Sequence, residues 1–248
     1  MAIINAKAVV LAAGKGVRMK SELPKVLHSL CGMPLVAHVL RSIRDSGISD
    51  IITVVGYKGD EVARAAGEGV RIAWQHEQKG TGHAVMQSAP LLEDYHGLVV
   101  VACGDVPLIS PDTIREMVAR ASEPGVRACV LTMIPANPFG YGRIIKESDG
   151  TLVKIVEEKD AGEEEKSVRE VNTGTYVFHS DFLFPGLKTI TTNNAQGEYY
   201  LPDVFNYIRS SGHVTRTVLL KDPIEGSGVN SPEELKKLEE YMERRSHS

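Results

Sequence analysis

The first half of the chain alternates between short apolar runs and segments whose apolar residues recur every three or four positions. Continuous apolar runs predict strands covered on both faces, and the helical spacing predicts helices that each bury one face. Short connections between them favour an α/β fold with a mostly parallel sheet and helices on both sides. The predicted strands are 6–11, 51–55, 70–74, 98–102 and 128–134, and the predicted helices are 34–45, 59–66, 81–88 and 111–122.

After about residue 135 the pattern changes. Two apolar-rich runs flank Asp149-Gly150, which is a signal for a β-hairpin. The later elements are predicted as strands 143–146, 152–156, 175–178 and 214–220 and helices 199–209 and 231–244, with 163–166 in a solvated turn or helix rather than a metal site.

Two helix starts carry capping signals. Thr81 is expected to cap helix 81–88. The last helix begins with Ser231 as the cap, Pro232 in the first position and Glu234 in the third, a combination typical of a helix N-terminus.

A phosphate-binding loop is predicted directly after the first strand. Leu11 to Gly14 ends that strand in small residues, and Gly16 follows. Small residues let the backbone approach an anion, and successive N–H groups in such a turn form an anion-binding concavity. Arg18 and Lys25 then add full positive charge. This combination indicates an enzyme that handles nucleotides.

Two other glycine-rich motifs are excluded. The dinucleotide fingerprint G-x-G-x-x-G needs glycine where Met19 stands, and the P-loop G-x-x-x-x-G-K-[ST] does not occur. An NAD-dependent oxidoreductase is therefore disfavoured. What remains is Leu-Ala-Ala-Gly-x-Gly-x-Arg-Met with a downstream Pro24-Lys25, which resembles the signature of sugar nucleotidyltransferases.

Composition narrows the class of partner. The chain has 248 residues, 42% hydrophobic and 24% charged, as in an ordinary globular protein. Its net charge of −4 argues against a nucleic-acid or anionic-membrane partner, and no apolar stretch approaches the roughly 20 residues that span a bilayer. The widely spaced Cys31, Cys103 and Cys129 favour reduced thiols in a cytoplasmic protein over zinc or disulfides.

Asp105 is a candidate metal ligand. It follows strand 98–102, and Gly104 lets the chain turn before it. A lone carboxylate beside bound phosphates suits Mg²⁺, which takes one or two protein oxygens and leaves its other positions to phosphate and water. The alternative is that Asp105 caps helix 111–122.

Other polar side chains are candidates for substrate contacts. The amide of Gln75 can read a pyrimidine edge, although taken alone Gln75 fits an exposed position. Nearby His76 and His83 form no metal pattern and are expected to be structural or exposed. Asn230 precedes Ser231, the better cap, so its amide is free for a ligand.

Polar groups in the second half suit a sugar. Gly142, Glu157 and Asn172 supply an open backbone, a carboxylate and an amide, the group types that hydrogen-bond hydroxyls. Each of these residues alone is also typical of a turn, but together they could line one polar side of a sugar-binding site. No nucleophile elbow G-x-S-x-G occurs, which fits direct displacement at phosphorus.

These motifs resemble the N-acetylglucosamine-1-phosphate uridylyltransferase domain of the bacterial GlmU family over about residues 6–235. The most specific segments are 11–19, 23–28, 80–84, 104–109, 140–144, 170–174 and 193–200. The resemblance implies a Rossmann-like nucleotide-diphospho-sugar transferase fold in a single domain, 1–248. Its parts would be a nucleotide-binding half, 6–135, a sugar-binding half with a small hairpin, 136–230, and a C-terminal helix, 231–245.

The resemblance also implies residue roles. Arg18 and Lys25 would grip the phosphates as the catalytic cations. Asp105 and Asn230 would bind Mg²⁺. The other implied substrate contacts are Leu11, Ala12, Ala13 and Gly14 to the nucleotide, Gln75, Gly80 and Thr81 to uracil and ribose, Cys103 and Gly104 near the ribose and sugar, and Gly142, Glu157 and Asn172 to the amino sugar.

Two departures from the family pattern are visible. Cys103 stands where relatives often carry tyrosine. The family's second half, a β-helix of hexapeptide repeats with acetyltransferase activity, has no counterpart in these 248 residues. Neither that activity nor the trimer built by the β-helix is implied, and no protein partner is expected.

The expected reaction is Mg²⁺-dependent transfer of UMP from UTP to N-acetylglucosamine 1-phosphate, with release of pyrophosphate. Two alternatives stay open. One is another sugar 1-phosphate, such as glucose 1-phosphate with UTP or dTTP. The other is a nucleotide-sugar sensor without turnover, against which the presence of Arg18, Lys25, Asp105 and Asn230 argues.

Overall fold

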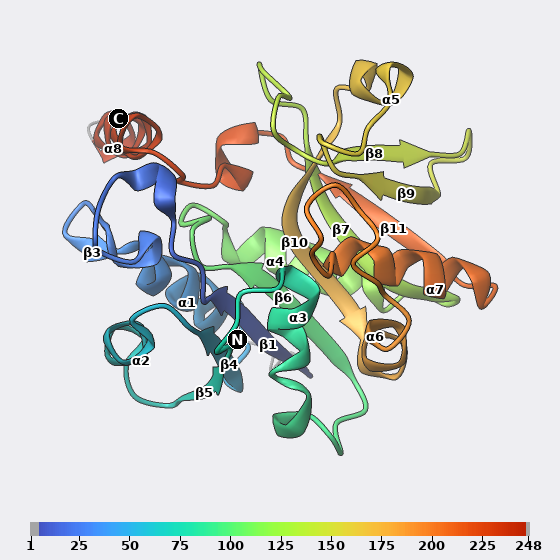
Figure 1. The fold of residues 1–248 in the computed structure, drawn as a ribbon, viewed down its shortest axis with the longest axis horizontal. Coiled ribbons are helices and arrows are strands. Elements are labelled where there is room, and N and C mark those ends of the chain that lie inside the picture. The colour runs from blue at the N-terminus through green and yellow to red at the C-terminus, as the bar shows by residue number, and fades with distance from the viewer. Residues whose placement is uncertain (1–4, 247–248) are drawn as a thin grey trace.

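A nine-stranded mixed sheet forms the centre of the computed structural model, which describes residues 5–246 (Figure 1). The predicted domain also includes residues 1–4 and 247–248, which lie outside the described residues. Seven strands follow one another in the order β11-β7-β10-β6-β1-β4-β5. The sheet strands are β1 (Ala6–Ala12), β4 (Ile51–Val55), β5 (Val70–Trp74), β6 (Leu98–Cys103), β7 (Val126–Met133), β8 (Arg143–Lys146), β9 (Leu152–Val156), β10 (Val171–His179) and β11 (Val214–Leu219).

The helices correspond mostly to the predicted segments. They are α1 (Leu35–Asp45), α2 (Gly59–Ala66), α3 (Thr81–Met86), α4 (Pro111–Ala121), α5 (Glu163–Ser167), α6 (Ser180–Leu187), α7 (Val204–Ser210) and α8 (Pro232–Ser246). Short 3₁₀ turns and a small hairpin connect them: η1 (Val17–Met19), η2 (Lys25–Leu27), η3 (Ala89–Leu91), η4 (Leu201–Asp203), η5 (Pro223–Gly226), β2 (Ser29–Leu30) and β3 (Met33–Pro34). Among residues 5–246, the helices are too short or too polar to cross a membrane.

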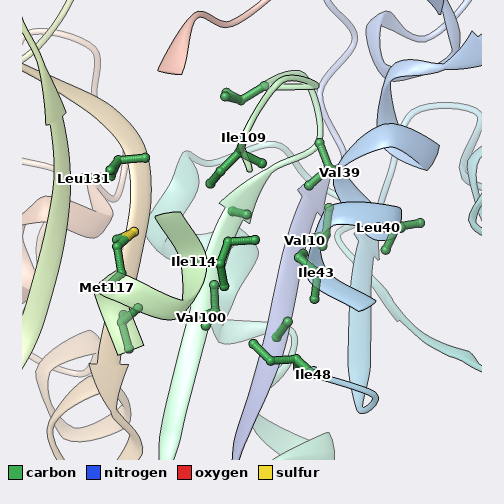
Figure 2. Close-up of a cluster of buried hydrophobic side chains, with 14 of the residues drawn as sticks. Val10, Val39, Leu40, Ile43, Ile48, Val100, Ile109, Ile114, Met117 and Leu131 are labelled. Carbon is green, nitrogen blue, oxygen red and sulfur yellow. The ribbon is translucent and has the colours of Figure 1, made fainter. Parts of the chain in front are cut away.

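Helices cover both faces of the sheet, as the continuous apolar runs predict. Along β6, Val100 packs with α1, α2 and α4 on one face, whereas Val99 and Val101 pack with α3, α6 and α7 on the other. Figure 2 shows the first of these clusters, with Val10 and Val100 from neighbouring strands facing side chains of α1 and α4. Side chains alternate across a strand, so a strand buried on both faces needs apolar residues throughout.

Strand β10 runs against the direction of its neighbours. It pairs antiparallel with β6 and β7, while β1, β4, β5 and β6 are mutually parallel and β7 is parallel to β11. Its register shifts between Asn172 and Tyr176, where Gly174 adopts a φ of 82°. The predicted strand 175–178 therefore captured only the second part of β10.

Other differences from prediction are local. The predicted helix 199–209 is the 3₁₀ turn η4 followed by α7, and α6, which contains Pro185, was not predicted. Asp149-Gly150 does connect the antiparallel strands β8 and β9, with Gly150 at a φ of 84°. The segment 163–166 lies in the short helix α5.

Candidate active site

The predicted phosphate loop follows β1 and folds back on Lys25. Gly16 adopts a φ of 69°, a left-handed conformation that favours glycine. A Cβ atom added there would overlap Lys25 Cβ, so this glycine also permits the close approach. Gly14 lies in the open, with no atom within 4 Å of an added Cβ. The glycine at position 16 therefore lets the loop lie directly against Lys25.

Arg18 is oriented by the residue that follows it. Met19 is 3% exposed and packs with Leu30, Val229 and Leu238, the last from α8. This small apolar cluster anchors η1 against the segment that precedes α8. As a result, Arg18 Nη2 donates to Asn230 Oδ1 at 2.9 Å.

Two predicted cations and two predicted metal ligands meet at the carboxyl end of β6. Lys25 Nζ donates to Asp105 Oδ2 and, at 2.9 Å, to Asn230 Oδ1, which also accepts from Arg18. The main chain supports this arrangement because Val229 N donates to Asp105 O at 2.8 Å. Lys25 and Asp105 are both mostly buried, at 19% and 15% side-chain exposure. If the Lys25 ammonium moved away, Asp105 Oδ2 and Asn230 Oδ1 would remain close together and could bind another cation.

Both capping hypotheses near this site are resolved. Ser110, not Asp105, caps α4, since its Oγ accepts from Thr113 N at 3.1 Å. Ser231 Oγ accepts from Glu234 N at 3.3 Å, as predicted for the start of α8. Asp105 and Asn230 therefore keep their side chains for the site.

The two oxygens of Asp105 and Asn230 fit a small divalent cation. Hard carboxylate and amide oxygens are the donors that Mg²⁺ prefers, and few protein ligands are needed. Both oxygens already converge on one positive charge, the Lys25 ammonium. Within the described part of the chain, no three side chains from His, Cys, Asp and Glu gather into a metal-binding group.

Gln75 and Thr81 lie differently from what the local sequence predicts. Gln75 is 3% exposed rather than exposed, because the chain turns inward after β5 and its amide bonds Gly80 O at 3.2 Å. Thr81 does not cap α3. Gly80 occupies the cap position, and Thr81 Oγ1 instead accepts from Leu201 N at 3.1 Å.

A cavity of about 280 Å³ extends from the predicted phosphate loop to the side chain of Gln75. Gly80 closes its wall with a φ of 101°, where an added Cβ would lie 2.6 Å from Tyr199 O. The lining contains most of the predicted nucleotide contacts, namely Leu11, Ala12, Ala13, Gly14, Lys25, Gln75, Gly80, Thr81, Cys103 and Asp105, together with Val26, Gln78, Ala84 and Glu198.

The predicted sugar contacts gather beside this cavity. Asn172 N donates to Gly142 O at 2.8 Å, and an added Cβ at Gly142 would lie 3.1 Å from Glu157 Oε1. Most of the Asn172 amide is already engaged, since Oδ1 accepts from Gly174 N at 3.0 Å and Nδ2 donates to Tyr176 at 2.6 Å. Its second N–H is the group left for a ligand.

Cys103 connects the two halves of the site. It lines the cavity, and its thiol donates to Gly174 O at 3.4 Å. Burial raises the pKa of the Cys103 thiol to about 12, with the Asp105 charge acting in the same direction. The group therefore stays a thiol at neutral pH and is unsuited to act as a nucleophile. An added Cβ at Gly104 would lie 3.1 Å from Leu11 O, which fits its close packing against β1.

Sequence reasoning missed two residues of the site. Glu198 lines the cavity, although its segment had been singled out only by resemblance. His83 is half-buried, and its Nδ1 lies 3.0 Å from Gln75 Nε2. The spacing of Gln75 and His83 across a helix start held no signal for this contact, because Gly80 determines how the chain turns between them.

The carboxyl group of Glu157 has a raised pKa. Burial raises the pKa of its carboxyl to about 7, and the charges of Asp160, Asp203 and Glu198 push it the same way. Because the folded-state pKa of this carboxyl lies above its ordinary value of 4.5, the folded state binds more protons than the unfolded state between these two values. Stability then falls as the pH rises from about 4.5 to about 7, and it levels off above that.

The Glu157→Gln variant is accordingly expected to be more stable than the wild type at pH 8, by on the order of 1–2 kcal/mol, and nearly equal to it at about pH 4 and below. Urea unfolding at several pH values measures the difference. Glu158→Gln is the control, because Glu158 pairs with Arg143 at 2.7 Å and gains nothing from losing its charge. A constant difference between the Glu157 variant and the wild type at all pH values would contradict the raised pKa.

The fold and the site together define a nucleotidyltransferase class. The sequence profile of the MobA-like NTP transferase domain matches residues 8–148, more than half of the chain. The chain therefore belongs to this family.

Its curated relatives include the bifunctional protein GlmU of several bacteria. Identity is 44% over 238 residues with that of Pelotomaculum thermopropionicum, 46% over 241 residues with that of Halalkalibacterium halodurans and 44% over 243 residues with that of Geobacillus thermodenitrificans. These matches cover 96%, 97% and 98% of this chain but only 52%, 53% and 53% of the relatives. The chain thus spans about half the length of the curated relatives it matches.

Proposed function

We propose that this chain transfers UMP from UTP to N-acetylglucosamine 1-phosphate and releases pyrophosphate. The observation that carries the proposal is the convergence of Arg18, Lys25, Asp105 and Asn230 at one end of the sheet, beside a loop suited to phosphates. The resemblance of the motifs to uridylyltransferases and the identity to GlmU proteins support the choice of substrates.

In the proposed reaction, a phosphate oxygen of the sugar 1-phosphate attacks the α-phosphorus of UTP in line. The new P–O bond forms as the bond to the β-phosphate oxygen breaks, and pyrophosphate leaves. The attacking phosphate is already ionised at neutral pH, so no general base is needed. Positioning and neutralisation of charge then account for most of the catalysis.

Each residue of the site has a part in this scheme. Arg18 and Lys25 neutralise charge on the transferring and leaving phosphates. Asp105 and Asn230 would hold Mg²⁺, which when bound supplies further positive charge to the phosphates. Lys25 would then leave the two oxygens for a phosphate, a short movement for a long, partly exposed side chain.

A pyrophosphate-release assay with a panel of substrates tests the proposal. UTP, dTTP and CTP are each combined with N-acetylglucosamine 1-phosphate and glucose 1-phosphate. UTP with the N-acetyl sugar is expected to give the highest kcat/KM, because a site built for particular hydrogen bonds rejects analogues that leave its buried polar atoms unpaired. If glucose 1-phosphate is used equally well or better, the sugar assignment is wrong. Binding without turnover of any pair would indicate a sensor.

A further inference from the structure

An irregularity in β10 brings the side chains of Asn172 and Tyr176 together. In the register with β7, Asn172 lies opposite Thr132 and Tyr176 lies opposite Val130. Four steps along β10 therefore match only two steps along β7, and the residues between are a bulge, with Gly174 at a φ of 82°. Across this bulge, Asn172 Nδ2 lies 2.6 Å from the Tyr176 hydroxyl oxygen.

The bulge also fixes the orientation of the Asn172 amide. Gly174 N lies 3.0 Å from the amide and can only donate, so the atom that faces it must be the amide oxygen. The amide nitrogen then faces Tyr176 and donates to its oxygen. Half a turn of the amide would set its nitrogen against Gly174 N, with two donors facing each other. The one N–H group of Asn172 that is left has its direction set by the other two bonds.

The Tyr176 hydroxyl is itself held in place. The residue is 3% exposed, and its ring packs against Phe178 and Phe205 with 5.7 Å between centroids in each case. Burial raises the pKa of the Tyr176 phenol well above its ordinary value, the bond from Asn172 offsets part of this shift, and the Glu157 charge adds to it. The hydroxyl is therefore an uncharged and immobile hydrogen-bond partner at neutral pH.

The only described route from this hydroxyl to the site runs through Asn172. Tyr176 is not part of the lining of the 280 Å³ cavity, and among residues 5–246 its hydrogen-bond partner is Asn172 alone. Asn172 in turn belongs to the predicted sugar side of the site, because its N donates to Gly142 O at 2.8 Å. The hydroxyl can thus act on a sugar by holding the amide.

We propose that Tyr176 is a positioning residue for the sugar 1-phosphate and acts through Asn172. The inference rests on the proposed function, with the sugar beside Gly142 and Asn172. Two anchors hold the free N–H group of the amide in one direction before the sugar arrives, so less conformational entropy is lost on binding. Without the hydroxyl, only the bond from Gly174 N remains, and the amide can move.

The Tyr176→Phe variant removes the hydroxyl and keeps the ring. Its KM for the sugar 1-phosphate is expected to rise about 3- to 10-fold, the effect of one lost hydrogen bond, while the KM for UTP stays unchanged. Tyr95→Phe is the matched control, because the Tyr95 hydroxyl donates to Leu98 O at 3.0 Å, at the start of β6 and away from the site. This control should change neither KM. An equal rise of both KM values in Tyr176→Phe would overturn the proposal.

A double-mutant cycle shows whether the hydroxyl acts through the amide. In the Asn172→Ala background, adding Tyr176→Phe should raise the KM for the sugar 1-phosphate no further. Additive effects would show that Tyr176 acts independently of Asn172 and would overturn this inference alone. If the wild type binds the sugar 1-phosphate without turnover, the same cycle is read from dissociation constants. A wild type that binds no sugar 1-phosphate would contradict the proposed function as well.

The side-chain amide of Asn172 provides a test that needs no variant. In the NMR spectrum of the wild-type protein, its two protons are expected to give separate signals, and the proton bonded to Tyr176 should exchange slowly with solvent. Addition of the sugar 1-phosphate should shift mainly the signal of the other proton. Rapid exchange of both protons in the free protein would show that the amide is not anchored and would overturn the proposal.

Discussion

Replacing Lys25 with alanine is expected to lower kcat/KM by about 10²–10³-fold, the typical effect of removing one electrostatic donor aimed at developing charge. Lys25 stands between Asp105 and Asn230 and lines the cavity beside the phosphate loop. The variant also leaves the mostly buried Asp105 without its ion-pair partner, so some stability is lost as well, while the fold is expected to persist. The rate is measured by release of pyrophosphate, and stability by urea unfolding.

Lys7→Ala is the matched control for this variant. Lys7 is also ion-paired with an aspartate, Asp50 at 3.0 Å, and its exposure of 26% is similar. It lies near the start of β1, at the opposite end of the sheet from the site. Its loss should leave the rate unchanged. Wild-type activity of Lys25→Ala would remove this lysine from the mechanism, whereas collapse of the fold would indicate a structural role.

Replacing Asp105 with asparagine is expected to abolish most of the activity and to weaken Mg²⁺ binding. The variant retains the shape of the side chain but loses the charge that attracts a hard cation. Metal binding can be measured without substrates, as the rise in Tm with increasing Mg²⁺. The wild type should be stabilised, and Asp105→Asn much less so.

Lys25→Ala again provides the contrast, now in the metal titration. It removes the ammonium that occupies the two oxygens of Asp105 and Asn230, and it leaves both oxygens in place. Mg²⁺ should therefore stabilise this variant at least as strongly as the wild type, although its turnover is low. Equal metal-dependent shifts in the wild type and Asp105→Asn would show that the carboxylate is not a ligand.

Most of the sheet could be predicted because its strands are buried on both faces. Runs such as 51–55 and 98–102 are apolar throughout, and the structure has strands there. Strand β10 was harder, since its first part contains Asn172, Thr173 and Gly174 and breaks the apolar run. Its antiparallel direction has no local signal either, because direction depends on where the chain crosses the sheet.

Part of the candidate site could also be predicted, because some of its residues directly follow strands that the sequence shows clearly. Arg18 and Asp105 could be found because each follows a predicted strand by a short, glycine-containing segment. Gln75 could not be placed by local pattern, since a polar residue after a strand is usually exposed. Its burial depends on Gly80 and on the packing of that glycine against the main chain of Tyr199.

The sequence by itself determined the α/β class and predicted the phosphate loop and the residue types of the candidate site. These properties depend on neighbours along the chain: apolar runs, small residues and the Ser231 cap. Only the tertiary structure decided that Lys25 bridges Asp105 and Asn230 and that the Gln75 amide turns inward to donate to Gly80 O. Such contacts join residues from separate elements, and their geometry follows from how helices and strands pack, which no short stretch of sequence encodes.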